Sequence, residues 1–278
     1  MKIKNIVVGL IASAASVAAA DAIAPSGDSS GSSDVAAIQS AIDAAGSGGS
    51  VELGSGIFYI DTQLMVTNGV TLAGQGWDNT IIKQVASTPS EYTRVATVSG
   101  GAKVERVTLT GGRVTGTNYK FGGGVCIDGG TVSWCCITNN SVSEANVKFG
   151  GGVGFPNASA GGTVDHCIVA DNSVSISNAS DFGGGGIGAY LPNGAITIDA
   201  CLIYGNRSAK PDGYGKGGGI GIDMVYQSYS VTVRNTTIVG NIAGNNENTS
   251  HGGAVYIAND SNRKFSMVNC IKIGRAHV

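Results

Sequence analysis

A short apolar pattern recurs five times in this chain at a spacing of about 34 residues, and it limits the possible folds more than any single residue does. The copies occupy residues 104–109, 132–137, 164–169, 198–203 and 233–238. Four of them are followed by an asparagine, at steps of 32, 34 and 35 residues: Asn140, Asn172, Asn206 and Asn241. A glycine-rich pattern alternates with the first, at residues 123–125, 151–153, 185–187, 218–220 and 253–255. Such a repeat predicts a solenoid, in which each unit buries its apolar face by stacking on its neighbours.

Each repeat is predicted to consist of strands and turns. Its two apolar, β-branched runs are separated by glycine and asparagine and lack the apolar spacing of a helix. We therefore expect an all-β fold, a parallel β-helix, whose coils lie about 4.8 Å apart so that equivalent residues form ladders. A corner is expected at Trp134, His166, Ala200 and Asn235, followed by the inward positions Cys135, Cys167, Cys201 and Thr236. The asparagines suit turns, because Asn tolerates a left-handed backbone and can stack its amide along the ladder.

The glycine-rich runs are interpreted as structural, since glycine allows sharp bends and close backbone approach. A phosphate-binding loop is the alternative. That loop is a single glycine-rich segment that opens a helix, whereas strands are predicted after every copy here.

On these motifs the chain resembles the right-handed parallel β-helix proteins of the pectin-lyase-like superfamily. The segment 252–255 and the asparagine motifs are similar to the repeats of polymorphic outer-membrane proteins. Residues 34–45, 48–53, 56–60 and 69–76 resemble the entry segment of pectate-lyase-superfamily domains. The resemblance implies a right-handed β-helix over residues 34–271, located at the cell surface, in the outer membrane or outside the cell.

The N-terminal residues predict export. Lys2 and Lys4 precede an apolar, alanine-rich run, and Ala18 and Ala20 form an Ala-x-Ala cleavage site, so residues 1–20 read as a secretory signal peptide rather than a transmembrane span. Residues 21–33 read as a flexible lead-in. A short helix is expected over residues 34–45, with Ser33 or Asp34 as its N-cap and its apolar side chains over the first coil.

The C-terminal residues are expected not to belong to the natural gene. Residues 272–278 can be back-translated into a common short-read sequencing adapter, and Lys272 stands where the repeat predicts an inward apolar residue. We therefore expect these residues to be an artefact and the repeat region to be C-terminally truncated. An uncapped last coil would expose strand edges and favour self-association.

The charge and the cysteines of the chain limit which partners and cross-links are expected. The formal net charge is −2 and no basic stripe is present, so nucleic acid is not an expected partner. Six cysteines in an exported protein usually suggest disulfides. Three of them fall in one inward column, however, where the strand spacing is too long for a disulfide, so buried free thiols are expected. Zinc binding by these cysteines is the alternative, but zinc needs ligands that converge on one point, whereas a column spreads its sulfur atoms along a line.

The search for catalytic residues identifies one candidate pair, Asp165 and Asp199, which occupy equivalent positions on successive coils. Solvated outward side chains, flanked by Ser133 and Arg234, are the favoured explanation of this pair. Asp128 and Asp223 are predicted to lie three coils apart, about 14 Å, which exceeds the spacing of paired glycosidase carboxylates. The Asn-Thr-Asp, Gly-His-Gly and Arg-x-Lys elements of polygalacturonases and the Arg-x-Pro-x-x-Arg element of pectate lyases do not occur.

The segments between the asparagine and glycine motifs vary in length and composition, which favours them as the functional surface. They and the adjacent strands supply the ligand-binding candidates Tyr190, Tyr214, Tyr256, Lys148 and Asp181. We expect a secreted or surface-exposed adhesin or passenger protein that binds a polysaccharide or a cell-surface glycan, with no metal or other cofactor. The alternative is a polysaccharide lyase or glycoside hydrolase, for which the superfamily resemblance would add calcium.

Overall fold

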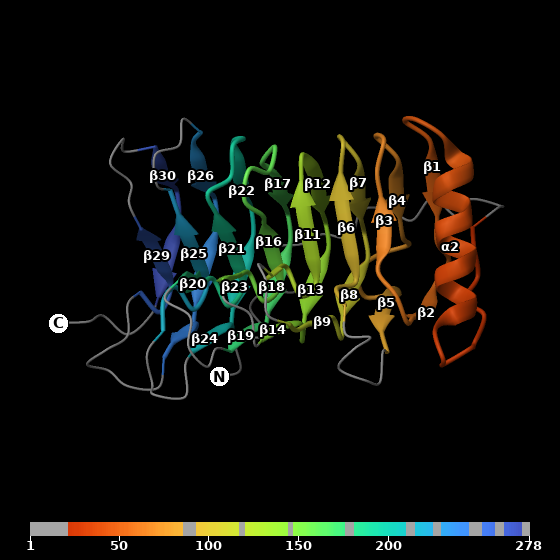
Figure 1. The fold of residues 1–278 in the computed structure, drawn as a ribbon, viewed down its shortest axis with the longest axis horizontal. Helices are drawn as coiled ribbons and strands as arrows, with labels where there is room; N and C mark the ends of the chain where they lie inside the picture. The colour runs from red at the N-terminus through yellow and green to blue at the C-terminus, as the bar shows by residue number, and fades with distance from the viewer. Residues whose placement is uncertain are drawn as a thin grey trace.

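The computed structural model describes residues 22–85, 93–116, 120–143, 147–175, 181–209, 215–224, 229–244, 252–258 and 264–273. They form a solenoid of short strands that pair in parallel with the equivalent strands of the coils before and after (Figure 1). The expected all-β parallel β-helix with one N-terminal helix is confirmed.

Three sheets form the wall of the solenoid, and one coil crosses them in the order I, II, III. Sheet I contains β3 (Leu64–Val66), β6 (Ala96–Ser99), β11 (Val125–Asp128), β16 (Val153–Phe155), β21 (Ile187–Tyr190), β25 (Ile220–Asp223) and β29 (Val255–Ala258). Sheet II contains β1 (Ser50–Glu52), β4 (Thr71–Ala73), β7 (Lys103–Glu105), β12 (Gly130–Ser133), β17 (Gly162–Asp165), β22 (Ile196–Asp199), β26 (Val231–Arg234) and β30 (Phe265–Val268). Sheet III contains β2 (Gly56–Ile60), β5 (Thr80–Gln84), β8 (Thr108–Thr110), β13 (Cys136–Thr138), β18 (Ile168–Ala170), β23 (Leu202–Tyr204), β27 (Thr237–Val239) and β31 (Ile271–Ile273).

Two further sheets project from this wall, and we call them together the fin. Sheet IV contains β9 (Arg113–Val114), β14 (Ser141–Ser143), β19 (Ser173–Ser175), β24 (Arg207–Ala209) and β28 (Ile242–Ala243). Sheet V contains β10 (Lys120–Phe121), β15 (Val147–Phe149) and β20 (Asp181–Gly183). These strands lie in the variable segments between the asparagine and glycine motifs, where the sequence predicted no strands. Val142 and Val174 are buried in the fin, so alternating apolar residues give it a core of its own.

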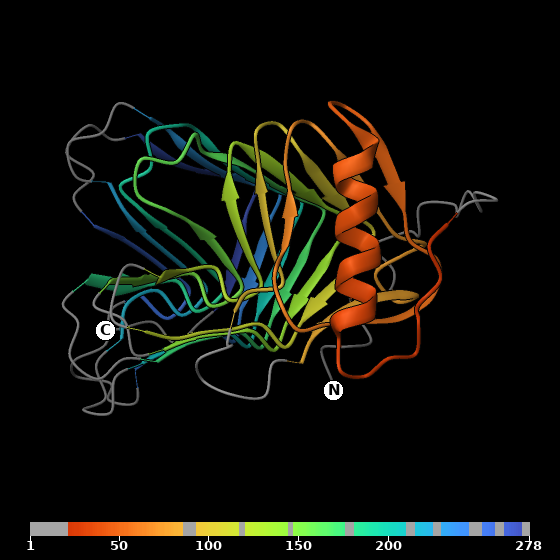
Figure 2. The ribbon, with the colours of Figure 1, turned by 45° about the vertical axis from the view of Figure 1, so that its right-hand side comes forward.

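Helix α2 (Ser32–Ala45) lies across the open end of the first coil (Figures 1 and 2). Ile38 and Ile42 are buried against the first strands, as expected, and Gly46 follows the last helical residue. The expected N-cap was wrong. The helix starts at Ser32, and the Asp28 carboxylate accepts the backbone N–H groups of Ser30 and Ser33 instead.

Asp34 has a structural role. Its buried carboxylate accepts the backbone N–H of Ser26 at 2.7 Å and that of Tyr59 in β2 at 2.8 Å. A buried carboxylate needs such donors to offset its desolvation. Asp34 therefore ties the lead-in segment and the first coil to the helix.

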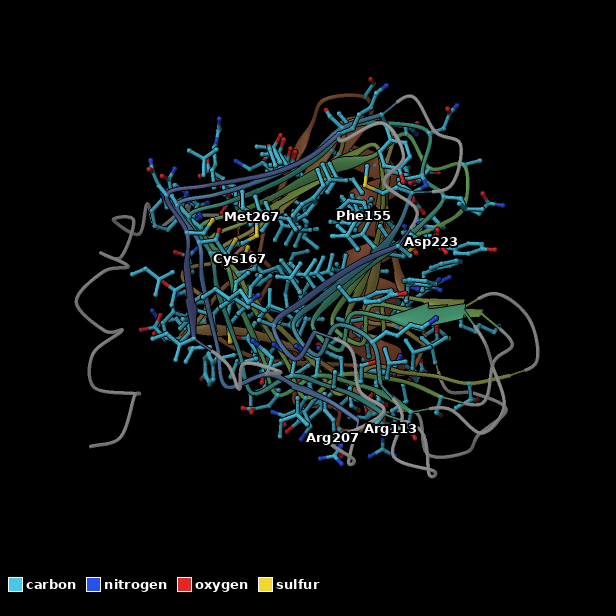
Figure 3. The ribbon with its side chains drawn as sticks, turned by 90° about the vertical axis from the view of Figure 1, so that its left-hand side faces the viewer. Arg113, Phe155, Cys167, Arg207, Asp223 and Met267 are labelled. Atoms are coloured by element: carbon cyan, nitrogen blue, oxygen red, sulfur yellow. The ribbon has the colours of Figure 1, made fainter. Side chains whose placement is uncertain are left out.

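The predicted corner and inward columns are confirmed. From β7 onward the corner residues between sheets II and III have positive φ, between 49° and 57° at Arg106, Trp134, His166, Ala200 and Asn235. Cys135, Cys167 and Cys201 then point inward and are buried. Figure 3 looks along the solenoid axis and shows Cys167, Phe155 and Met267 on the inner side of the wall.

The six cysteines, all of them among the described residues, are free thiols. The thiol of Cys201 donates to the backbone carbonyls of Asp199 at 3.0 Å and Val164 at 3.5 Å, and Cys135 and Cys167 repeat this arrangement. Burial raises the pKa of Cys135 and Cys201 well above the usual range. Cys135 and Cys201 therefore stay neutral and act as small apolar fillers that also satisfy backbone acceptors.

The four repeat asparagines form a buried ladder of side-chain amides. The Asn172 carboxamide oxygen accepts both the backbone N–H and the Nδ2 of Asn140 at 3.0 Å. Its Nδ2 donates to Asn206 Oδ1 at 3.0 Å and to the Ile137 carbonyl at 2.8 Å. The left-handed backbone expected for these asparagines occurs one residue earlier, at Asn139, Asp171, Gly205 and Gly240. The amides therefore serve as interior hydrogen-bonding groups rather than as turn formers.

The glycine motif packs against this ladder where the fin leaves the solenoid. A Cβ atom on Gly152 would lie 2.8 Å from Asn172 Nδ2, and one on Gly151 would lie 2.4 Å from the Ser173 carbonyl oxygen. The strand that enters the fin and the strand that leaves it thus meet at backbone contact. Only glycine permits that approach, which explains why the two sequence motifs recur together.

We predict that Asn172→Ala lowers the free energy of unfolding by about 3 kcal/mol, because it leaves the buried Asn140 N–H and Ile137 carbonyl without partners. The measurement is urea denaturation followed by circular dichroism. Asn193→Ala, at an exposed turn, is the control and should stay within about 0.5 kcal/mol of the wild type. Equal midpoints for Asn172→Ala and the wild type would contradict a stabilising role for the ladder.

Candidate functional site

Asp165 and Asp199 end neighbouring strands of sheet II, β17 and β22, and pair directly in register. Ser133 precedes them in this column and Arg234 follows, as the repeat predicts. The two candidate catalytic residues are therefore neighbours, about 4.8 Å apart along the backbone. Both lie beside the corner that leads into sheet III, so the chemistry of this edge depends on the corner side chains.

The Asp199 carboxylate is held by two donors from the next coil. Arg234 Nε donates to Oδ2 at 2.7 Å, and Asn235 Nδ2 donates to Oδ1 at 2.9 Å. Partial desolvation raises the pKa of Asp199, but the hydrogen bonds from Asn235 and Arg234 outweigh it and hold the pKa below its usual range. Asp199 is therefore ionised near neutral pH and unsuited to donate a proton.

Asp165 forms its contact within its own coil. Its Oδ1 lies 2.8 Å from His166 Nδ1, so the carboxylate orients the imidazole. The imidazole stacks on the Trp134 indole of the preceding coil, with ring centroids 4.2 Å apart and an angle of 19° between the planes. The sequence placed His166 and Trp134 at the corner but did not predict that their rings stack. The stack could have been inferred from the spacing of these two aromatic residues, which is one coil.

A second carboxylate pair, Glu52 and Glu105, lies on the same column and was missed. They face each other across Ala73, and both approach Arg106 Nη2, at 3.6 Å and 3.3 Å. Burial raises the pKa of Glu52 more than the attraction of Arg106 lowers it. Glu52 was missed because it lies before the first recognisable repeat. Since Arg106 approaches both carboxylates, the cluster is an ion-pair network rather than an open catalytic site.

The ligand-binding candidates gather at a different place, the junction between the outer face of sheet I and sheet V of the fin. The outward column of sheet I contains Cys126, Gly154, Gly188, Gly221 and Tyr256. A Cβ atom on Gly154 would lie 2.2 Å from the backbone nitrogen of Gly122, at the end of β10. The glycine column thus lets the fin pack directly on the wall.

Tyr190 lies over an aromatic base at this junction. Its ring centroid is 6.4 Å from that of Phe121 and 5.3 Å from that of Phe149, and Phe121 and Phe149 are buried. The same cluster covers Cys126, which faces away from the solenoid core as expected but is buried. Tyr190 itself is half-exposed, so a rigid base supports an accessible phenol ring.

Tyr256 lies two coils further along, and Lys216 Nζ lies 5.5 Å from the centroid of its ring. The backbones of Lys148 and Asp181 belong to β15 and β20 of the fin, while their side chains lie outside the described part of the chain. Tyr214 also lies outside the described residues. The structure thus brings Tyr190 and Tyr256 to one junction, with Lys148 and Asp181 on the adjacent strands. Figure 3 shows Asp223 on the outer side of sheet I and Arg113 and Arg207 on the outer side of the fin.

Neither surface offers a metal centre within the described ranges, where no group of three or more His, Cys, Asp or Glu side chains could hold an ion. Over the same residues, no helix has both the length and the apolar character needed to cross a membrane. The described side chains of these two surfaces are charged, amide and aromatic groups arranged in ladders.

Comparison with known proteins identifies the fold. The family described as "Right handed beta helix region" matches residues 95–275, which is more than half of the chain. A search of curated proteins gave no match. The handedness expected from the sequence resemblance is thereby confirmed.

Solved structures that match this chain include a pectin methylesterase variant in complex with a hexasaccharide. The match has 11% sequence identity and a TM-score of 0.39, and it covers 94% of this chain and 91% of that one. Another is the catalytic unit of a thermostable GH87 alpha-1,3-glucanase from Streptomyces thermodiastaticus, at 16% identity and a TM-score of 0.22, covering 95% of this chain and 70% of that one.

We predict that the purified protein releases no product from polygalacturonate, alginate or glycosaminoglycans, with or without calcium. The pKa of Asp199 is held below its usual range, so Asp199 is unsuited to donate a proton, and the Asp165 carboxylate is in contact with His166 Nδ1. Reducing-end and unsaturated-product assays test this. Product release that is abolished by Asp165→Ala or Asp199→Ala would make the protein an enzyme.

Proposed function

The chain belongs to the right-handed β-helix family, and from that premise we propose that it is a secreted or surface-exposed protein of the adhesin or passenger type that binds glycans. The observation that carries the proposal is the junction between sheet I and the fin. There, half-exposed Tyr190 stands on a rigid aromatic base, and Tyr256 with Lys216 lies two coils away along the same side of the solenoid.

This arrangement suits an extended polymer. Equivalent positions recur about every 4.8 Å along the junction, so successive units of one chain would meet successive coils. The C–H face of a sugar ring is apolar and packs on an aromatic face, while polar groups at the rim accept or donate hydrogen bonds. The apolar, alanine-rich N-terminal segment supports export.

The alternative is a polysaccharide lyase or glycoside hydrolase that acts at Asp165 and Asp199. The observation in its favour is their direct pairing on adjacent coils. The proposed binding function needs no cofactor, and calcium belongs to the lyase alternative alone.

We predict that Tyr190→Ala and Tyr256→Ala each weaken glycan binding by roughly fivefold, because each removes an aromatic surface that contributes about 1 kcal/mol. Glycan arrays followed by calorimetry on the best ligand provide the measurement. Tyr204→Ala, which removes a half-exposed tyrosine from the outer face of sheet III, is the matched control and should bind as the wild type does. Unchanged affinity in both junction variants would refute this site.

Self-association is the second proposed partnership. β29, β30 and β31 stand at the ends of their sheets, and Val268 in β30 and Ile271 in β31 are 52% and 58% exposed. Exposed apolar residues on a terminal strand favour pairing with another chain.

We expect the double variant Val268→Lys with Ile271→Lys to be more monomeric than the wild type, because charges at a strand edge oppose edge pairing. Sedimentation velocity over a concentration series measures this. Ile57→Lys is the control, because Ile57 lies on the same face of sheet III at the opposite, helix-covered end. A wild-type protein that stays monomeric throughout the series would count against the proposal.

A further inference from the structure

The corner between sheets II and III carries one side chain per coil, and one of these positions lacks a long side chain. The backbone φ is between 49° and 57° at the six corners from the β7–β8 connection onward: Arg106, Trp134, His166, Ala200, Asn235 and Asn269. The adjoining strands pair in register, so the six side chains leave the backbone in the same direction. They form a ladder with one rung per coil, about 4.8 Å apart.

The spacing of this ladder suits flat rings. Trp134 and His166 occupy successive rungs and stack with centroids 4.2 Å apart and planes 19° from parallel. Asp165 holds the His166 ring through Nδ1, which limits its rotation. Two aromatic rungs thus form a rigid stack that ends at the second face of the imidazole.

Ala200 is the next rung, and its methyl group cannot cover that face. The His166 side chain is 41% exposed although the solenoid continues past it. The following rung is Asn235, two coils from His166 and therefore about 9.6 Å away. One ring placed above Ala200 would lie about 4.8 Å from the His166 ring, the coil spacing, with the Asn235 amide, which reaches toward Asp199, on its other side.

The two flanks of this position differ in polarity. On the sheet II side, the Asp199 carboxylate is fixed by Arg234 and Asn235, and these two bonds leave further lone pairs on its oxygens. On the sheet III side lies Leu202, which is apolar. A ring with an apolar face and hydroxyl groups along one edge matches both the stacking surface and the polar flank.

We propose that the position above Ala200 is a binding site for one neutral sugar ring, stacked on His166 and hydrogen-bonded through its hydroxyl groups to Asp199 and Asn235. Asp165 and Asp199 place two carboxylates beside it, so uronate rings are disfavoured by charge repulsion. The ligand class rests on the proposed glycan binding, whereas the surface is separate from the junction at Tyr190.

The test uses the fluorescence of Trp134, which directly contacts His166. Trp77→Phe leaves Trp134 as the sole tryptophan of the chain. In this background, neutral gluco-, manno- and galacto-oligosaccharides are titrated alongside oligogalacturonates. We expect a saturable change in Trp134 emission with at least one neutral series, and at least tenfold weaker binding of the oligogalacturonates.

Substitutions at the corner locate the binding, and calorimetry measures them because two of them add a tryptophan. Ala200→Trp fills the rung with a residue that the equivalent position 134 already accepts at a similar backbone φ, so the fold is expected to persist. It should weaken binding at least tenfold. Ala158→Trp is the matched control, an exposed alanine with φ 58° at a turn between sheets I and II, and it should have no effect. His166→Ala should abolish the site, while His166→Phe should retain most of the affinity, because stacking needs the ring and not its nitrogen atoms.

The outcomes separate this inference from the proposed function. Binding that is lost in Tyr190→Ala and unchanged in Ala200→Trp would overturn the corner site and leave the junction standing. Binding that is lost in Ala200→Trp and retained in Tyr190→Ala would support the corner site. A neutral-sugar titration without any change in Trp134 emission would also overturn the inference.

Discussion

The buried asparagine ladder is the interaction on which the shape of this solenoid depends. Each amide donates to a backbone carbonyl of the coil before it and accepts an N–H group from that coil, and the ladder closes the interior where sheet III passes into the fin. An unpaired amide or backbone group at that depth costs about 1–3 kcal/mol, so every rung needs its neighbours. The buried asparagine hydrogen bonds therefore set the coil spacing and the register, because water cannot compete for these donors and acceptors inside the solenoid.

The fin follows from this closure. Because the amides satisfy the backbone at the branch point, the chain can leave the wall, form two extra sheets and return through glycines in backbone contact with the outgoing strand. The returning strands then pack on the glycine column of sheet I. The result is a long junction beside the solenoid wall, where Tyr190 and Tyr256 are presented on supported backbones rather than on loops.

The sequence predicted the repeat, the register, the corner and the inward thiols, because each depends on a local pattern that recurs once per coil. Asp165 and Asp199 were placed correctly as neighbours for that reason. The fin strands were not foreseen, since two- and three-residue strands such as β9 and β14 carry too little periodicity to distinguish them from loops. The Trp134–His166 stack and the Glu52–Arg106–Glu105 cluster depend on side-chain conformation across coils, which a single sequence does not contain.

In a ladder, each residue belongs to one coil, so a single substitution changes the surface of that coil alone. At the corner, the backbone accepts tryptophan, histidine, alanine and asparagine at nearly the same φ, so the fold places little restriction on which side chain stands there. What varies is the surface: an aromatic stack at Trp134 and His166, and an open position at Ala200 beside a fixed carboxylate. A solenoid of this kind can therefore acquire a binding site by shortening one rung, without any change to the hydrogen bonds that hold its coils together.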